Sequence, residues 1–243
     1  MPRNPAWTRD ELILALDLFF RVDPIRVSSD SLEIREVSAI LNELPIHVER
    51  PDSARFRNPN GVHMKLPSFL RFDPAYAGKG LTRGGHLEED VWNEFSADRP
   101  ALAATAQAIR DNRGSISVQQ VAAQTTGDEE EFSEGLLLEA IHKRRERSPS
   151  AVRRKKESVL TQKGSLECEA CGFDFEAVYG DLGRGYAECH HTKPLSELSR
   201  STKTRLGDLA IVCANCHRMI HRSRPMLSIS ELGEMVTTKI IDF

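Results

Sequence analysis

Apolar residues at helical spacing run through the first hundred residues of the chain. Leu12, Leu16 and Phe19 follow Thr8-Arg9-Asp10-Glu11, a segment with the form of a capping box, so a helix is expected from about residue 9 to 21. The same spacing predicts further helices over about 30–43, 86–96, 100–111 and 132–146. The pattern therefore indicates a mainly helical N-terminal part.

The hydrophobic pattern changes in the last third of the chain. Residues 186–191 and the apolar run 209–212 have the length of short strands, and a helix is expected to begin near Ala214. The resulting order is a two-stranded ribbon followed by a helix. This order differs from the helical part before it and predicts a second domain.

The chain length is consistent with that division, since 243 residues are long for one domain and suit two. We expect a helical domain over 1–111, a charged linker and basic helix over 112–160, and a metal-binding domain over 161–243. The 40% of hydrophobic and 28% of charged residues are typical of a soluble protein. Because no apolar run reaches membrane length and the N-terminus lacks a signal-peptide pattern, we expect a cytoplasmic location and no membrane partner.

The net charge of −3 hides a strongly basic segment. Between residues 136 and 163, nine basic residues stand against three acids, which gives a local charge of +6. The basic residues are Lys143, Arg144, Arg145, Arg147, Arg153, Arg154, Lys155, Lys156 and Lys163. Such a run can be a solvated linker, but directly before a metal-binding domain it also fits an arm that contacts phosphates.

Four of the five cysteines form two Cys-x-x-Cys pairs, Cys168/Cys171 and Cys213/Cys216. Two intervening residues let both sulfurs of a pair reach one ion, and two such pairs predict a closed, structural zinc. The fifth cysteine, Cys189, is expected to lie on a strand and to face away from His190.

Four histidines in the same stretch exceed what a structural zinc requires. His217 and His221 are four residues apart and share one face of the expected helix, where the ribbon can bring His190 to the same ion. His190 and His191 are neighbours on a strand and face opposite sides, so we expect one to hold metal and the other to activate water. The alternative is that the histidines only extend the surface of a zinc ribbon.

These motifs together resemble the HNH, or ββα-metal, nucleases. The residues that carry the resemblance are Cys168-x-x-Cys171, Glu188-x-His190-His191, Asp208 and Cys213-x-x-Cys216-His217-x-x-x-His221. The resemblance implies that His190, His217 and His221 bind a catalytic divalent cation (Mg²⁺, Mn²⁺, Ni²⁺, Co²⁺ or Zn²⁺), with His191 as general base. It also places Asp208 where the family has asparagine, and Glu188 and Arg184 where some members pair a glutamate with a phosphate-binding arginine.

The first hundred residues resemble the N-terminal domain of McrA-type restriction endonucleases, which implies recognition of 5-methylcytosine or 5-hydroxymethylcytosine in duplex DNA. The segments concerned are 7–12, 57–66 and 85–95. Arg57, Asn58, Asn60 and Lys65 lie in or beside a turn and are the expected DNA contacts. The expected fold is α+β, with a mainly helical recognition domain followed by a ββα-metal nuclease domain that carries a four-cysteine zinc.

The two resemblances together imply a modification-dependent restriction endonuclease that hydrolyses phosphodiester bonds in methylated double-stranded DNA. A homodimer is expected, because one HNH site cuts one strand and a two-fold axis would match a palindromic target. Two other interpretations stay open. One is an HNH endonuclease that reads unmodified DNA or cuts without specificity, and the other is a zinc module that binds DNA without cutting it.

Overall fold

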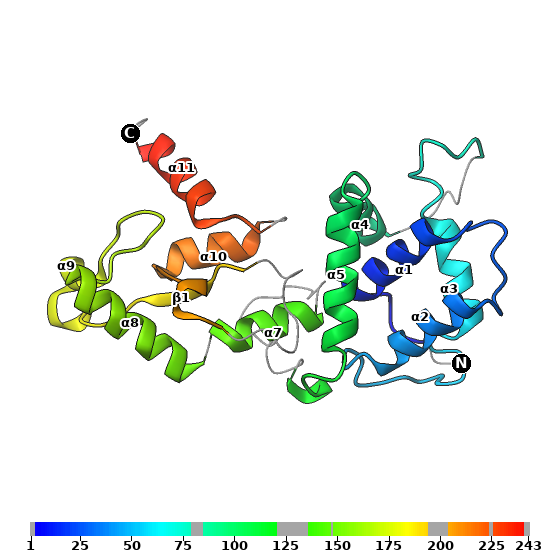
Figure 1. The fold of residues 1–243 in the computed structure, drawn as a ribbon, viewed down its shortest axis with the longest axis horizontal. Coiled ribbons are helices and arrows are strands. Elements are labelled where there is room, and N and C mark those ends of the chain that lie inside the picture. Colours follow the sequence, from blue (N-terminus) through cyan, green and yellow to red (C-terminus); the bar gives the residue numbers. More distant parts are fainter. Residues whose placement is uncertain are drawn as a thin grey trace. The chain divides into compact units, whose positions relative to one another are not determined.

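The computed structural model describes residues 3–78, 85–120, 136–146, 148–193, 204–223 and 226–240 (Figure 1). The described residues divide into two compact units: the N-terminal unit extends to Ile141 and the C-terminal unit begins at His142. This division lies within the segment predicted as linker and basic helix, and the domain boundaries expected at 111 and 160 stay predictions. Residues 121–135 of the predicted linker lie outside the described residues.

The N-terminal unit is helical, as predicted. Its elements are α1 (Arg9–Arg21), α2 (Leu32–Glu43), α3 (Pro59–Lys65), η1 (Leu66–Ser68), α4 (His86–Phe95) and α5 (Arg99–Asn112). Helix α1 packs against α2, α4 and α5, and its residues Leu12 to Phe19 are buried. The capping box of Thr8 and Glu11 is present, and Asp98 caps α5 by accepting from the backbone N–H of Ala101.

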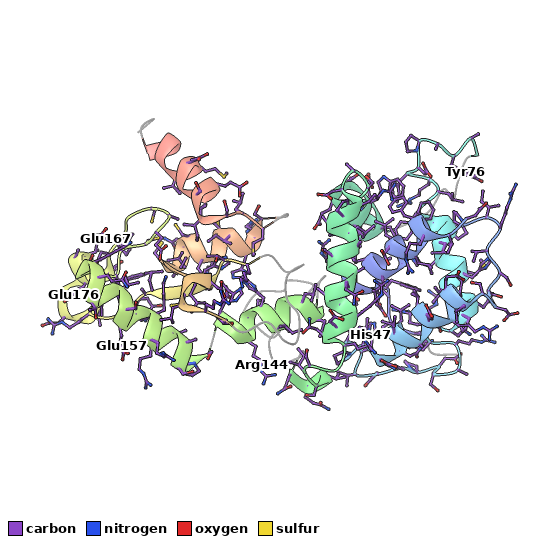
Figure 2. All side chains as sticks on the ribbon, in the orientation of Figure 1. His47, Tyr76, Arg144, Glu157, Glu167 and Glu176 are labelled. Carbon is purple, nitrogen blue, oxygen red and sulfur yellow. The ribbon has the colours of Figure 1, made fainter. Side chains whose placement is uncertain are left out.

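An ion pair lies inside this helical core, where the side chains fill the space between the helices (Figure 2). Arg57 Nε lies 2.7 Å from Glu11 Oε1, and Nε2 of His47 lies 3.2 Å from the same oxygen. The Arg57 backbone has a φ of +42°, which is unusual for a residue other than glycine, and its carbonyl accepts from Ser38 Oγ at 2.8 Å. The pair therefore ties the segment before α3 to the start of α1.

The C-terminal unit combines helices with a two-stranded sheet. It begins in the last turn of α7 (Leu136–Glu146), followed by α8 (Pro149–Lys163), α9 (Phe175–Tyr179) and η2 (Gly180–Leu182). The remaining elements are β1 (Glu188–His191), η4 (Leu206–Asp208), β2 (Leu209–Val212), α10 (Ala214–Arg222) and α11 (Ile229–Ile240). The mixed fold with a small sheet confirms the expected class.

The two strands pair antiparallel, with His190 opposite Ala210 and Glu188 opposite Val212. Helix α10 follows β2 directly, so the predicted order of ribbon and helix is confirmed. Cys189 packs in an apolar cluster with Val159 of α8, which places it away from the metal-ligand candidates as expected. None of the described helices is long and apolar enough to cross a membrane.

Candidate active site

The two Cys-x-x-Cys pairs come together in the C-terminal unit. The four Sγ atoms lie within 4.8 Å of one another, and Cys171 Sγ is 3.8 Å from Cys213 Sγ. Sulfurs bound to zinc at about 2.3 Å in a tetrahedron are about 3.8 Å apart. The arrangement of the four cysteines therefore fits a zinc ion.

The four thiols do not share one environment. Burial raises the pKa of Cys171 to about 11 and raises the pKa of Cys216, whereas backbone hydrogen bonds outweigh burial at Cys168 and lower its pKa. A bound zinc deprotonates its thiol ligands and links binding to folding. Cys213 is the N-cap of α10, while Cys168 and Cys171 precede β1, so the ion would join two segments about forty residues apart along the chain.

A second cluster surrounds the carboxylate of Glu146, at the end of α7. The closest distances from its oxygens are 2.8 Å to His190 Nδ1, 3.0 Å to His142 Nε2, 3.2 Å to His221 Nε2 and 3.3 Å to His217 Nε2. The side chains of Glu146, His142 and His190 are at most 4% exposed, whereas His217 and His221 are 17% and 25% exposed. The cluster is closed at α7 and open to solvent along α10.

The histidine cluster also fits a metal. His142 Nε2 and His190 Nδ1 lie near Glu146, yet among the described residues neither nitrogen makes a hydrogen bond of acceptable geometry. One ligand atom from each of His142, Glu146, His190 and His221 lies within 4.8 Å of the others. Buried imidazole nitrogens that converge without hydrogen bonds are the usual surroundings of a transition-metal ion.

Glu188 holds the ring of His217. Its Oε2 atom lies 2.5 Å from His217 Nδ1, which leaves Nε2 of the ring facing Glu146 and His221. Burial would lower the pKa of His217, but contacts with Glu146 and Glu188 outweigh it and raise that pKa to about 9. The hydrogen bond from His217 in turn lowers the pKa of Glu188. Carboxylates that orient a histidine in this way commonly accompany metal ligands.

His191, the candidate base, is fully buried at the end of β1. Its backbone N–H donates to Glu146 Oε1 at 3.0 Å, and its Nε2 lies 3.5 Å from Thr204 Oγ1. Asp208 holds the loop beyond it: the Asp208 carbonyl accepts from the backbone N–H of Thr192 at 2.8 Å, and its carboxylate pairs with Lys193 at 3.2 Å. Asp208 therefore contacts the loop that follows His191, and its catalytic role stays a prediction.

Comparison with known proteins agrees with this geometry. Residues 168–223, which hold both Cys-x-x-Cys pairs and four histidines, match the family model of the HNH endonuclease. The C-terminal unit carries an HNH endonuclease domain. Nucleases with this domain use divalent metals, and the donors of the two clusters could hold such ions.

A relative covers most of the chain as well as the HNH domain. The type IV methyl-directed restriction enzyme EcoKMcrA of Escherichia coli (strain K12) is 24% identical over 229 residues, which are 90% of this chain and 78% of that protein. No solved structure matches the chain. The HNH domain and this relative support a metal-dependent DNA endonuclease.

Arg184 is not brought to Glu188. It is exposed at the end of the η2 segment, where its guanidinium pairs with Glu176 at 3.1 Å and with Asp181. Within the described part of the HNH domain, these acids are its ion-pair partners. The role of Arg184 as a phosphate ligand stays a prediction.

The four expected DNA contacts of the N-terminal unit differ in availability. Arg57 is 5% exposed and paired with Glu11, and Lys65 pairs with Glu88 at 2.8 Å. The Asn58 side chain caps α3 by accepting from the backbone N–H of Gly61. Asn60 is the exposed member of the set. The structure thus gives internal roles to three of these residues, and their contacts with DNA stay predictions.

The metal motifs of the sequence do not include His142 and Glu146. Glu146 is one of the three acids in the basic segment. The spacing held a signal, because a histidine and a glutamate four residues apart share one face of a helix. Both residues precede the segment that matches the HNH family model, so the motif itself did not include them.

Proposed function

We propose that the protein is a modification-dependent endonuclease, which recognises 5-methylcytosine in duplex DNA and hydrolyses a phosphodiester bond at the histidine cluster. The observation that carries the proposal is the convergence of His190, His217 and His221 in one cluster next to His191. The methyl-directed relative, which aligns with 90% of the chain, supports the modified base as the target.

The residues of the cluster have distinct tasks in this reaction. A neutral His191 imidazole would take a proton from the water that attacks the phosphorus. A divalent cation held by the histidines would neutralise the phosphate and stabilise the leaving oxygen. Glu188 fixes the ring of His217, and Asp208 fixes the loop after His191. Because His191 is fully buried, its ring must gain access to water when DNA binds.

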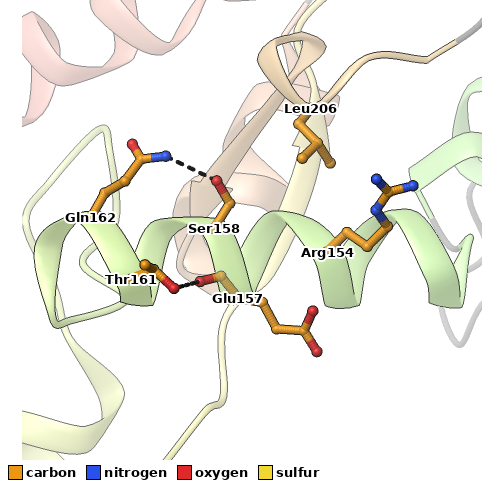
Figure 3. Close-up of a pocket in the computed structure, with 6 residues that line it drawn as sticks. All are labelled: Arg154, Glu157, Ser158, Thr161, Gln162 and Leu206. Atoms are coloured by element: carbon orange, nitrogen blue, oxygen red, sulfur yellow. Dashed lines mark hydrogen bonds between the residues drawn. The ribbon is translucent and has the colours of Figure 1, made fainter.

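The basic segment would hold the backbone of the DNA. Helix α8 exposes Arg153 and Arg154, and a hollow beside Arg154 is lined by Ser158, Thr161 and Gln162 of the same helix (Figure 3). Hydroxyl, amide and guanidinium groups are common phosphate contacts. Glu157, which also lines this hollow, would limit the number of phosphates it can hold. The side chains of Arg145 and Arg147 lie outside the described residues.

Cleavage of one plasmid prepared in three methylation states tests the proposal. Unmodified, 5-methylcytosine and 5-hydroxymethylcytosine forms are incubated with purified protein and Mg²⁺, Mn²⁺, Co²⁺, Ni²⁺ or Zn²⁺. We expect cleavage of the methylated form and none of the unmodified form. Equal cleavage of all forms would indicate a nuclease without base-modification specificity, and binding without cleavage in any metal would indicate a non-catalytic zinc module.

A further inference from the structure

Helix α7 brings two donors to the histidine cluster from outside the segment that matches the HNH family model. We propose that Glu146 and His142 are ligands of the catalytic metal, in a set of four protein donors with His190 and His221. This inference rests on the proposed function, because it assigns further ligands to the same metal. It also gives Glu146, one of the three acids in the basic segment, a direct chemical role.

The distances around Glu146 are those of a coordination shell. Ligands bound to a metal at about 2.1 Å are about 3.0 Å apart in an octahedron and about 3.4 Å apart in a tetrahedron. The four imidazole nitrogens lie 2.8–3.3 Å from the nearest Glu146 oxygen. His217 Nε2 and His221 Nε2 are 3.0 Å apart. His142, Glu146, His190 and His221 thus share the spacing of atoms bound to one ion, and His217 lies beside this set.

Burial and bonding separate this arrangement from an ordinary ion-pair network. Glu146 is 4% exposed and His142 is 2% exposed, so both are removed from water. A buried carboxylate is stabilised by hydrogen bonds of good geometry, yet His142 Nε2 and His190 Nδ1 make none within the described residues. A cation shared by Glu146, His142, His190 and His221 satisfies the carboxylate and the nitrogen lone pairs together.

The donor set also predicts how the site works. Imidazole and carboxylate ligands suit Mn²⁺, Co²⁺, Ni²⁺ and Zn²⁺ better than Mg²⁺, which prefers oxygen ligands. Four donors leave two positions of an octahedron for a phosphate oxygen and water. His217 and His221 are the exposed histidines of the cluster, so we place those positions on the side of α10.

Metal titration of the full chain tests the two ligands. Protein with its four-cysteine site filled with zinc is titrated with Co²⁺ by calorimetry and visible absorption. We expect Glu146→Gln and His142→Ala each to weaken binding by at least about 100-fold, the upper limit for residues that only orient a ligand. Arg144→Gln is the matched control, since Arg144 (Figure 2) is an exposed residue of the same helix and should leave the affinity unchanged.

The variants also distinguish coordination from charge. Glu146→Asp keeps the negative charge but shortens its reach, so a direct ligand loses affinity and alters the Co²⁺ spectrum. One zinc per chain in each variant shows that the C-terminal unit has folded. Wild-type affinity in Glu146→Gln or in His142→Ala overturns the assignment of that residue as a metal ligand. Tighter Co²⁺ binding with faster cleavage in Glu146→Gln also overturns the ligand assignment. That result would show that Glu146 blocks the metal site in the wild-type protein.

Failure of the proposed function has a different signature. If the wild-type protein binds no metal beyond the structural zinc, the histidine cluster is not a metal site, and both the proposed function and the further ligands are wrong. If the wild-type protein binds Co²⁺ and cuts DNA but the two variants bind it equally well, only the further ligands are wrong.

Discussion

At the scale of single residues, the adjacent side chains of His190 and His191 have different neighbours. His190 points its Nδ1 toward Glu146, whereas the His191 ring lies near Thr204 in the loop between the strands. Alternation along β1 explains the difference, because neighbouring side chains leave opposite faces of a strand. The sequence was sufficient to predict this difference in direction, since the strand and the two residues are local. The separate roles of the two histidines stay predictions.

The base assignment predicts a selective loss of activity. We expect His191→Ala to lower the cleavage rate by about 100- to 10,000-fold, the usual contribution of a general base, while DNA and metal affinity stay close to wild type. Single-turnover cleavage and Co²⁺ titration measure the two properties. Glu167→Gln, a change at an exposed residue of the same unit, is the control. Normal turnover by His191→Ala would contradict the assignment.

The neighbours of Glu146 could not be predicted from local sequence. Its place in the cluster depends on contacts with His190 and His221, which are 44 and 75 residues away in the sequence. Helical spacing places Glu146 and His142 on the same face of α7, but it does not reveal which residues that face packs against. Long-range packing supplies this information, and local patterns do not carry it.

At the scale of elements, the cysteine site connects parts of the C-terminal unit that have little other core. The apolar cluster around Cys168, Cys213 and Cys216 includes Val212, Ile220 and Leu232, so it joins β2, α10 and α11. Two four-residue strands bury little surface by themselves. The zinc is therefore expected to supply much of the folding energy of this unit.

Zinc removal should unfold one unit and spare the other. We expect Cys213→Ala, or a strong chelator, to reduce the helical circular-dichroism signal while tryptophan fluorescence is retained, because Trp7 and Trp92 both belong to the N-terminal unit. Cys189→Ala is the matched control, since this cysteine packs in the apolar cluster of α8 and should keep the zinc. Simultaneous loss of both signals would show that the two units fold as one.

The N-terminal unit should respond to acid through Glu11. Burial would raise the pKa of Glu11, but hydrogen bonds from His47 and Arg57 outweigh it and lower that pKa below its ordinary value. The ion pair therefore stabilises the unit above about pH 4.3, the unfolded pKa, and its contribution is lost as the pH falls through the folded pKa. We expect Glu11→Gln to lower the free energy of unfolding of the N-terminal unit at neutral pH, measured by tryptophan fluorescence. In the variant this free energy should also depend less on pH in the acidic range. An unchanged acid dependence would contradict the prediction.

For the whole molecule, the sequence predicted the helices, strands and cysteine cluster better than it predicted the residues that contact DNA. The helices, the ribbon and the cysteine site follow from short-range periodicity and spacing, and the structure contains each of them. Arg57 and Lys65 are expected DNA contacts because they are charged residues in or near a turn. In the structure they pair with Glu11 and Glu88 inside the unit. Whether a charge faces solvent or an internal partner depends on tertiary packing, which a turn pattern does not reveal.

The number of active sites per chain limits how duplex DNA can be cut. One HNH domain acts on one strand at a time, so a double-strand break needs two domains or two successive encounters. We propose that the protein dimerises on a palindromic methylated site, because two-fold symmetry places one active site on each strand. The rate of conversion of supercoiled plasmid to linear DNA should then rise more steeply than linearly with protein concentration.

Mixed dimers provide the decisive form of this test. Wild-type protein combined with excess His191→Ala should yield mainly nicked circles, because each mixed dimer retains one working site for two strands. A dimer with one inactive site cannot make a linear product in a single encounter. Independent monomers would only be diluted by the variant, so the ratio of nicked to linear product would stay the same. An unchanged ratio, together with a monomeric mass on methylated duplex by light scattering, would contradict dimer-dependent cleavage and indicate a monomeric nicking enzyme.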